Sequence, residues 1–84
     1  MEVTEVRVRR VSDGEGKVRA RCSVVLDGEF VVHGVKLVEG ENGLFVSMPS
    51  RRTSQGRYVE VAHPLTAEMR EKIRAAVERS YAAS

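Results

Sequence analysis

Strand signals dominate the first sixty residues, and the clearest of them is an alternation of apolar and polar residues, which is the pattern of β-strands that bury one face. The alternation is most regular from Lys17 to Asp27, where every second residue from Val18 to Leu26 is apolar. A shorter run with the same period surrounds Val6 and Val8. The segment Asp13 to Gly16 has turn composition, so these two strands are expected to form an antiparallel hairpin.

Turn signals divide the rest of this region into three more expected strands. Asp27-Gly28 predicts a tight hairpin because both central residues of such a turn need positive φ. In the run that follows, Phe30 to Val38, apolar residues occupy both odd and even positions. This strand is therefore either buried on both faces or broken by a bulge at Gly34. Asn42-Gly43 predicts the next hairpin turn. The last two strands are expected at Leu44 to Met48, ended by Pro49, and at Tyr58 to Ala62, ended by His63-Pro64.

After Pro64 the spacing of apolar residues changes from two to about 3.6, which predicts an amphipathic helix over about residues 66–82. Thr66 is the expected N-cap, and Glu68 in the first turn favours the helix dipole. The apolar stripe consists of Met69, Ile73, Ala76, Val77, Ser80 and Tyr81. We therefore expect a single α+β domain over residues 1–84, with a five-stranded, mainly antiparallel sheet at about residues 2–62 and one C-terminal amphipathic helix.

Composition narrows the class of protein. A chain of 84 residues has room for one modest core, so self-association is expected to add stability. It contains no signal-peptide pattern and no apolar span of about 18 residues, which favours a cytoplasmic protein without membrane contact. Cys22 is the only cysteine, and no Cys/His cluster has the spacing of zinc ligands. Neither a metal nor a cofactor is expected.

Few residues could support catalysis, and none of them forms a recognised motif. The obvious candidates are Cys22, Asp27, His33, Glu60 and His63. Cys22 falls on the apolar face of a strand, so it is expected to be a core residue rather than a nucleophile. His63, at a strand-to-helix junction, is expected to satisfy backbone groups. We therefore expect a protein without enzymatic activity.

Charge is unevenly distributed although the net charge is only +2. Between Asn42 and Val59 there are three arginines and no acidic residue. Arg51 and Arg52 can reach phosphate oxygens, and Gly56 would let the backbone approach a ligand closely. The alternative is a solvated hairpin loop. The candidate nucleic-acid-binding residues are Ser50, Arg51, Arg52, Thr53, Gln55, Arg57 and Tyr58.

A second basic surface is expected on the polar sides of the first two strands. It comprises Arg7, Arg9, Lys17, Arg19 and Arg21. Like charges on paired strands are destabilising, so acidic neighbours, a partner subunit or nucleic acid should offset them. The alternative is a solvated face with local acidic partners. Among the aromatic residues, Phe45 and Tyr81 are expected in the core, whereas Tyr58 either stacks on a base or packs at a strand edge.

Four segments together resemble the SpoVG family, nearly from end to end. They are Met1-Glu2-Val3-Thr4-Glu5-Val6-Arg7, Leu26-Asp27-Gly28-Glu29-Phe30-Val31-Val32-His33, the run from Asn42 through Met48-Pro49-Ser50 to Thr53, and His63-Pro64. The resemblance implies a small bacterial regulator of sheet-plus-helix fold that dimerises through strands. It also implies a role in septation, sporulation or gene expression, and binding to DNA or, in some members, to RNA.

The resemblance also assigns a role to the basic loop. The basic signature of the family falls on Arg51-Arg52-Thr53 and is associated with nucleic-acid binding. Arg51 stands where lysine is common, and Ser54-Gln55-Gly56 replaces the usual Pro-Asp-Gly, which leaves the loop more positive and less rigid. The expected partners are DNA or RNA and a second copy of the chain. The alternative is a protein-interaction module of the cell-division machinery that binds DNA weakly.

Overall fold

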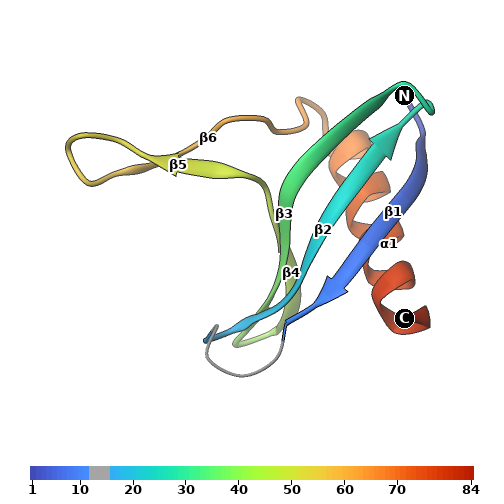
Figure 1. The fold of residues 1–84 in the computed structure, drawn as a ribbon, viewed down its shortest axis with the longest axis horizontal. Coiled ribbons are helices and arrows are strands. Elements are labelled where there is room, and N and C mark those ends of the chain that lie inside the picture. The colour runs from blue at the N-terminus through green and yellow to red at the C-terminus, as the bar shows by residue number, and fades with distance from the viewer. Residues whose placement is uncertain (12–15) are drawn as a thin grey trace.

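The computed structural model describes residues 1–11 and 16–84, so most of the turn expected at Asp13 to Gly16 lies outside the described residues. Four strands form an antiparallel sheet in the order β1-β2-β3-β4, and one helix packs against β1, β2 and β4 (Figure 1). The elements are β1 (Val3–Arg10), β2 (Val18–Leu26), β3 (Phe30–Gly40), β4 (Gly43–Ser47), β5 (Ser50–Arg52), β6 (Tyr58–Glu60) and α1 (Ala67–Ala83).

The predicted α+β class is confirmed, but the single five-stranded sheet is wrong. Ser50–Arg52, expected as loop, is strand β5, and it pairs with β6 in a separate two-stranded sheet. We call residues 50–60 the arm. Pro49 lacks a backbone N–H and so ends the pairing of β4, after which the chain leaves the sheet. Figure 1 shows the arm projecting away from the sheet and the helix.

Backbone geometry confirms two of the predicted irregularities. Asp27 and Gly28 both have positive φ, 52° and 65°, and the Glu29 N–H donates to the Leu26 carbonyl at 3.0 Å. Gly34 has a φ of 81°, and the β2–β3 register shifts beside it, which identifies the bulge. A Cβ at Gly34 would lie 3.3 Å from that of Pro49. Glycine at this bulge therefore lets the base of the arm approach β3.

The turn between β3 and β4 is displaced by one residue from the predicted Asn42-Gly43. Gly40 pairs with Gly43, so Glu41 and Asn42 are the two residues that connect the strands. Gly43 has a φ of 116°, a conformation that L side chains rarely adopt.

The core lies between one face of the sheet and α1. Its buried apolar residues are Ala20, Cys22, Val24, Leu26, Val35, Leu37, Met48, Ile73, Ala76 and Val77. The alternation along β2 and the helical stripe are thus confirmed. Cys22 is a core residue, and burial raises the pKa of its thiol. Tyr81 packs against this core, but Phe45 is 49% exposed, so its predicted burial is wrong. Phe45 lies on the edge strand β4 and pairs with Val38 of β3. At this position its side chain points to the face of the sheet that is turned away from the helix.

Both ends of α1 are held by side chains. Thr66 is the N-cap, as predicted, and its hydroxyl accepts from the Met69 N–H at 3.0 Å. The last turn contains no basic residue of its own. Arg10 from β1 donates instead to the carbonyls of Tyr81 at 2.8 Å and Ser84 at 3.2 Å, which places a positive charge at the negative end of the helix dipole. In the described part of the chain, no helix is long and apolar enough to cross a membrane.

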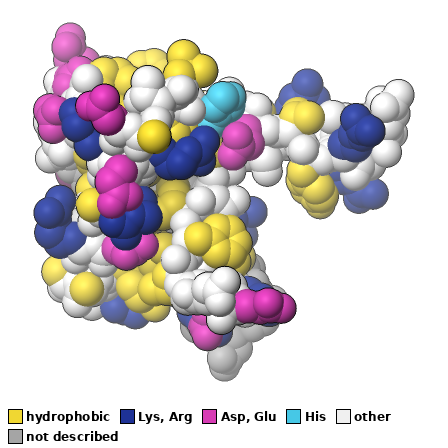
Figure 2. Space-filling view, turned by 180° about the vertical axis from the view of Figure 1, so that it is seen from behind, with side chains coloured by type: hydrophobic (Ala, Val, Ile, Leu, Met, Phe, Trp, Pro, Cys, Tyr) yellow, Lys and Arg dark blue, Asp and Glu magenta, His cyan; other side chains and the backbone are white. Residues whose placement is uncertain are grey.

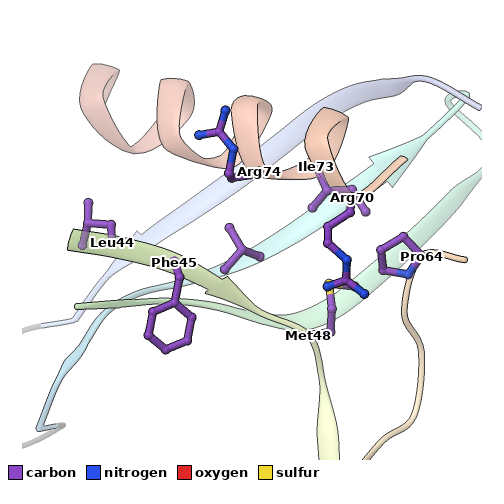
Figure 3. Close-up of a pocket in the computed structure, with 8 residues that line it drawn as sticks. Leu44, Phe45, Met48, Pro64, Arg70, Ile73 and Arg74 are labelled. Carbon is purple, nitrogen blue, oxygen red and sulfur yellow. The ribbon is translucent and has the colours of Figure 1, made fainter. Parts of the chain in front are cut away.

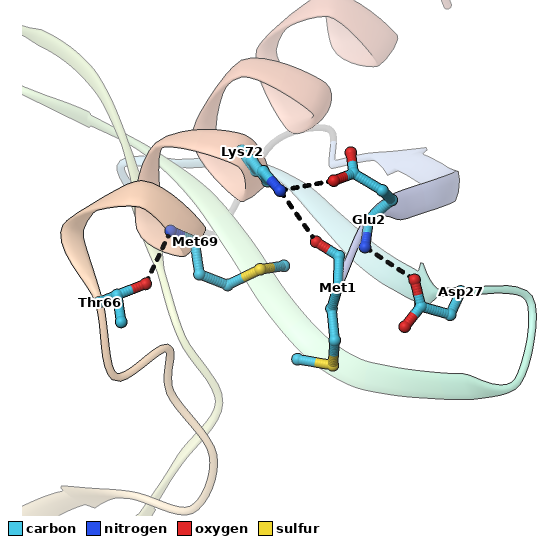
Figure 4. Close-up of polar contacts among 6 residues, drawn as sticks. All are labelled: Met1, Glu2, Asp27, Thr66, Met69 and Lys72. Atoms are coloured by element: carbon cyan, nitrogen blue, oxygen red, sulfur yellow. Dashed lines mark hydrogen bonds and ion pairs between the residues drawn. The ribbon is translucent and has the colours of Figure 1, made fainter.

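An ion pair links the amino terminus of the chain to α1 (Figure 4). Lys72 donates from Nζ to Glu2 Oε2 at 2.5 Å and to the Met1 carbonyl at 3.2 Å. The hydrogen bond from Lys72 lowers the pKa of the Glu2 carboxyl below its ordinary value of 4.5. A carboxyl with a lowered folded-state pKa stabilises the fold above its unfolded-state pKa and loses that contribution as the pH falls.

Glu2→Gln is accordingly expected to lower the melting temperature at neutral pH and to have a smaller effect at acidic pH. As the pH falls below 4.5 and through the lowered pKa, Glu2 of the parent becomes protonated and loses its charged pair with Lys72. The parent and the variant then differ less in stability. Thermal melts of both proteins at neutral and acidic pH measure the difference. Glu29→Gln is the control because Glu29 makes no ion pair with any described residue. An equal effect of Glu2→Gln at both pH values would contradict this account.

Candidate nucleic-acid interface

The arm is a short antiparallel ribbon that carries the predicted site residues. Ser50 pairs with Glu60, Arg51 with Val59 and Arg52 with Tyr58. Successive side chains of a strand point to opposite faces, so Arg51 and Arg52 lie on opposite faces of the ribbon. Arg52 shares its face with Tyr58. The loop predicted from the sequence did not specify how the two arginines are oriented, and the ribbon separates them.

Thr53 builds the turn at the tip of the arm. Its hydroxyl accepts from the Gln55 N–H at 3.3 Å and from the Arg57 N–H at 3.1 Å. Its own N–H donates to the Arg57 carbonyl at 2.6 Å. Gly56 completes the turn with a φ of 82°. Because its hydroxyl accepts from two backbone N–H groups, Thr53 positions Arg57, and the O–H of the hydroxyl remains available to donate to a ligand.

The charged groups of the arm are accessible and mostly of one sign. Arg51, Arg52 and Arg57 are exposed, and none of them forms an ion pair with a carboxylate of the described residues. The one acidic residue of the arm, Glu60, lies at its base opposite Ser50. Tyr58 is 73% exposed. Figure 2 shows Lys and Arg side chains on more than one side of the projecting arm.

The arm adds nothing to the core. No residue of the arm belongs to the buried cluster, and the arm is fastened at its base, where the Val61 N–H donates to the Pro49 carbonyl at 2.8 Å. Apolar side chains remain exposed in and beside it, including Val59 at 38% and Val61 at 58%. Since a lone two-stranded hairpin is only marginally stable in water, the arm is suited to being ordered by a partner.

Two of the predicted basic residues on the sheet have local acidic partners. Arg7 pairs with Glu5 at 2.8 Å, and this hydrogen bond lowers the pKa of Glu5. Arg19 pairs with Glu39 at 2.5 Å. For these two residues the alternative of a solvated face with acidic neighbours is confirmed. Arg9 and Arg21 lie directly opposite each other on β1 and β2.

Each histidine has one polar contact through its Nδ1 atom. The Nδ1 atom of His63 lies 3.0 Å from the Pro64 carbonyl oxygen, so the predicted backbone contact is confirmed. The Nδ1 atom of His33 lies 2.7 Å from the Ser23 hydroxyl. Among residues 1–11 and 16–84, no three His, Cys, Asp or Glu side chains are placed to hold a metal ion.

An apolar groove separates α1 from β4 (Figure 3). Its volume is about 190 Å³. The lining residues are Leu44, Phe45, Val46, Met48, Pro64, Arg70, Ile73 and Arg74. Arg74 is held by ion pairs with Glu71 and Glu78, whereas Arg70 forms none with the described residues. This groove was not anticipated from the sequence, because it depends on how far the edge strand lies from the helix.

Comparison with known proteins gives one consistent result. The family model SpoVG matches residues 1–83. A protein of Desulforudis audaxviator named "Putative septation protein SpoVG" is 57% identical over 81 residues, which cover 96% of this chain and 91% of that protein. Proteins of the same name from Thermoanaerobacter sp. and Clostridium novyi are 48% and 49% identical over 96% of this chain, and over 87% and 80% of their own lengths.

Proposed function

The chain belongs to the SpoVG family, and on that premise we propose that it is a bacterial regulator that binds nucleic acid through the arm. It acts as a homodimer in the cytoplasm, without catalysis and without a metal or cofactor. The ligand is DNA or RNA, contacted mainly along the backbone. Its cellular role lies in septation, sporulation or the control of gene expression, in keeping with the name that its relatives carry.

The observation that supports nucleic-acid binding best is the placement of arginines on both faces of a projecting ribbon. The major groove of B-DNA is wide enough to admit a two-stranded β-ribbon. Arg51 on one face and Arg52 on the other would then reach phosphates on the two walls of the groove. A ribbon lying flat on the duplex would use only one of them. Tyr58, exposed beside Arg52, adds a hydroxyl or a stacking surface.

Exposed strands and apolar side chains support the homodimer. β4 is an edge strand of the four-stranded sheet, and among residues 1–11 and 16–84 the strands β5 and β6 pair only with each other. Val59 and Val61 are exposed beside these edges. Unpaired strand edges favour association with another chain. Two-fold symmetry would present two arms to one nucleic-acid molecule.

Arg51→Ala combined with Arg52→Ala is expected to weaken binding to DNA of any sequence and to leave the fold intact. For every phosphate that is no longer bound, the slope of log K against log salt should become less steep by about 0.9 for duplex DNA. Gel-shift titrations at several salt concentrations measure both effects. Arg70→Ala with Arg79→Ala on α1 is the matched control, since it removes the same charge from another surface. A double variant of the arm that binds with unchanged affinity and slope would refute the proposal.

The groove between α1 and β4 supports a second candidate function, a protein-interaction module of the cell-division machinery. The groove is mainly apolar and bordered by Arg70, so it suits an amphipathic protein segment with an acidic residue. Pull-down from lysate with and without nuclease separates the two functions. Protein partners that remain bound after nuclease treatment, and that no longer bind the Leu44→Glu variant, would favour the interaction module.

A further inference from the structure

Three cations lie side by side across three strands of the sheet. Arg9 on β1 is directly opposite Arg21 on β2, and Arg21 is directly opposite Lys36 on β3. We call these residues the cationic row. Ala20 and Cys22, the neighbours of Arg21 along β2, are buried beneath the helix. The alternation of strand side chains therefore places the row on the outer face of the sheet, away from α1.

The row is an unfavourable arrangement for an isolated sheet. Directly opposed residues have Cβ atoms about 4.5–5.5 Å apart, and like charges at that distance are destabilising. Arg21 has a contact of its own, but Arg9 and Lys36 form no ion pair with a carboxylate of the described residues. Arg7 and Arg19, in contrast, each have a glutamate partner on the same sheet. Arrangements that lower stability, such as opposed like charges, are found most often at functional sites.

The row leads to the base of the arm. Lys36 pairs with Ser47, the last residue of β4, and the arm begins at Ser50, directly after Pro49. The close approach of Gly34 to Pro49, 3.3 Å for a Cβ added at Gly34, brings the base of the arm against β3 two residues from Lys36. A ligand held by the arm can therefore continue past the base of the arm onto the outer face of the sheet, where it meets Lys36 first.

We propose that the cationic row is a second binding surface for the phosphate backbone of the nucleic acid that the arm holds. The inference rests on the proposed function of the arm. The row extends over two strand spacings, about 10 Å, which is enough for more than one phosphate of a strand that carries a charge about every 3.4 Å along the duplex axis. Phosphates beside the row would give Arg9 and Lys36 the anionic partners that no carboxylate of the described residues supplies.

Arg9→Gln combined with Lys36→Gln tests the row. Fluorescence anisotropy with a labelled duplex DNA and a labelled single-stranded RNA, over a series of salt concentrations, gives the slope of log K against log salt. We expect the slope to become less steep by about 1.8 for the duplex or about 1.4 for the single strand. The melting temperature should stay equal or rise because a repulsion between like charges is removed.

The control is Arg70→Gln with Arg79→Gln, which removes two positive charges from exposed positions on α1. A row variant whose slope matches that of the control or the parent would overturn the inference. The proposed function of the arm is tested separately. If the arm variant, Arg51→Ala with Arg52→Ala, has a less steep salt slope than the parent, the arm still binds nucleic acid even when the row does not. A lower melting temperature of the row variant would also overturn the inference, since it would mean that the row stabilises the sheet. Absence of binding by the parent would overturn the proposed function itself.

Discussion

Replacing Leu37 with alanine is expected to lower the free energy of unfolding by about 2–5 kcal/mol. Leu37 lies on β3 between Ala20 on β2 and Val46 on β4, and its side chain is 0% exposed. It is among the largest fully buried side chains of the protein. Truncation removes its apolar contacts and leaves a cavity, because neighbouring strands held by backbone hydrogen bonds cannot close over the space. Urea denaturation followed by circular dichroism measures the loss.

Leu65→Ala is the matched control for this prediction. Leu65 is the same residue type, but it is 91% exposed in the segment before α1. A substitution that touches no core atom should change the free energy of unfolding by no more than about 0.5 kcal/mol. A single domain has only about 5–15 kcal/mol of stability, so the Leu37 variant should be clearly weakened. Similar effects of the two substitutions would contradict the position assigned to the core.

The elements that could be predicted from the sequence are those that bury one face. β2 is recognisable from its strict alternation and α1 from its period of about 3.6, because burial against a common core imposes those periods. Asp27-Gly28 is recognisable because its turn requires positive φ, and both residues have it. Gly34 is identifiable as a bulge for the related reason that glycine tolerates the irregular backbone that an extra residue creates.

The arm could not be predicted as a ribbon because neither of its faces is buried in this chain. Ser50–Arg52 is polar throughout, so it has no apolar period from which a strand could be recognised. Pro49 correctly indicates the end of β4, but it gives no sign that pairing resumes one residue later. Phe45 was misplaced for a different reason. Phe45 pairs with Val38 and not with the buried Leu37, so it lies on the face of the sheet that the helix does not cover.

The candidate site was predicted by composition and missed in its geometry. Arg51 and Arg52 stand out because no acid lies near them in the sequence, but their opposite orientation follows only from the pairing of β5 with β6. Lys36 was not anticipated as a member of the basic surface. Its position opposite Arg21 depends on the bulge at Gly34, which shifts the register of β3 by one residue.

Core and candidate site therefore occupy separate parts of the chain. The buried cluster is complete without any residue between Pro49 and Val61, whereas the exposed arginines of the arm all lie within that interval. A segment that adds nothing to the core still costs conformational entropy on folding. Its presence is explained if an external partner supplies the compensating contacts, which is the role proposed for nucleic acid and for a second subunit.

Excision of the arm is expected to abolish nucleic-acid binding while the remaining chain still folds cooperatively. The design removes residues 50–60 and joins Pro49 to Val61 through Gly-Gly, which is feasible because the Val61 N–H already lies 2.8 Å from the Pro49 carbonyl oxygen. Binding should disappear because the three arginines leave with the arm and the cationic row alone retains too few phosphate contacts. Circular dichroism melts and anisotropy titrations measure the two outcomes.

A chain that keeps the arm but carries Ser54→Ala is the control for this excision. Ser54 is an exposed residue at the tip of the arm and is not one of its candidate binding residues, so alanine should leave the ribbon and its binding nearly unchanged. Full retention of binding by the excised chain would show that nucleic acid is held by the sheet alone. Loss of the cooperative melt would contradict a core that is complete without the arm. Folding without binding is the result that follows from a core built entirely outside the arm.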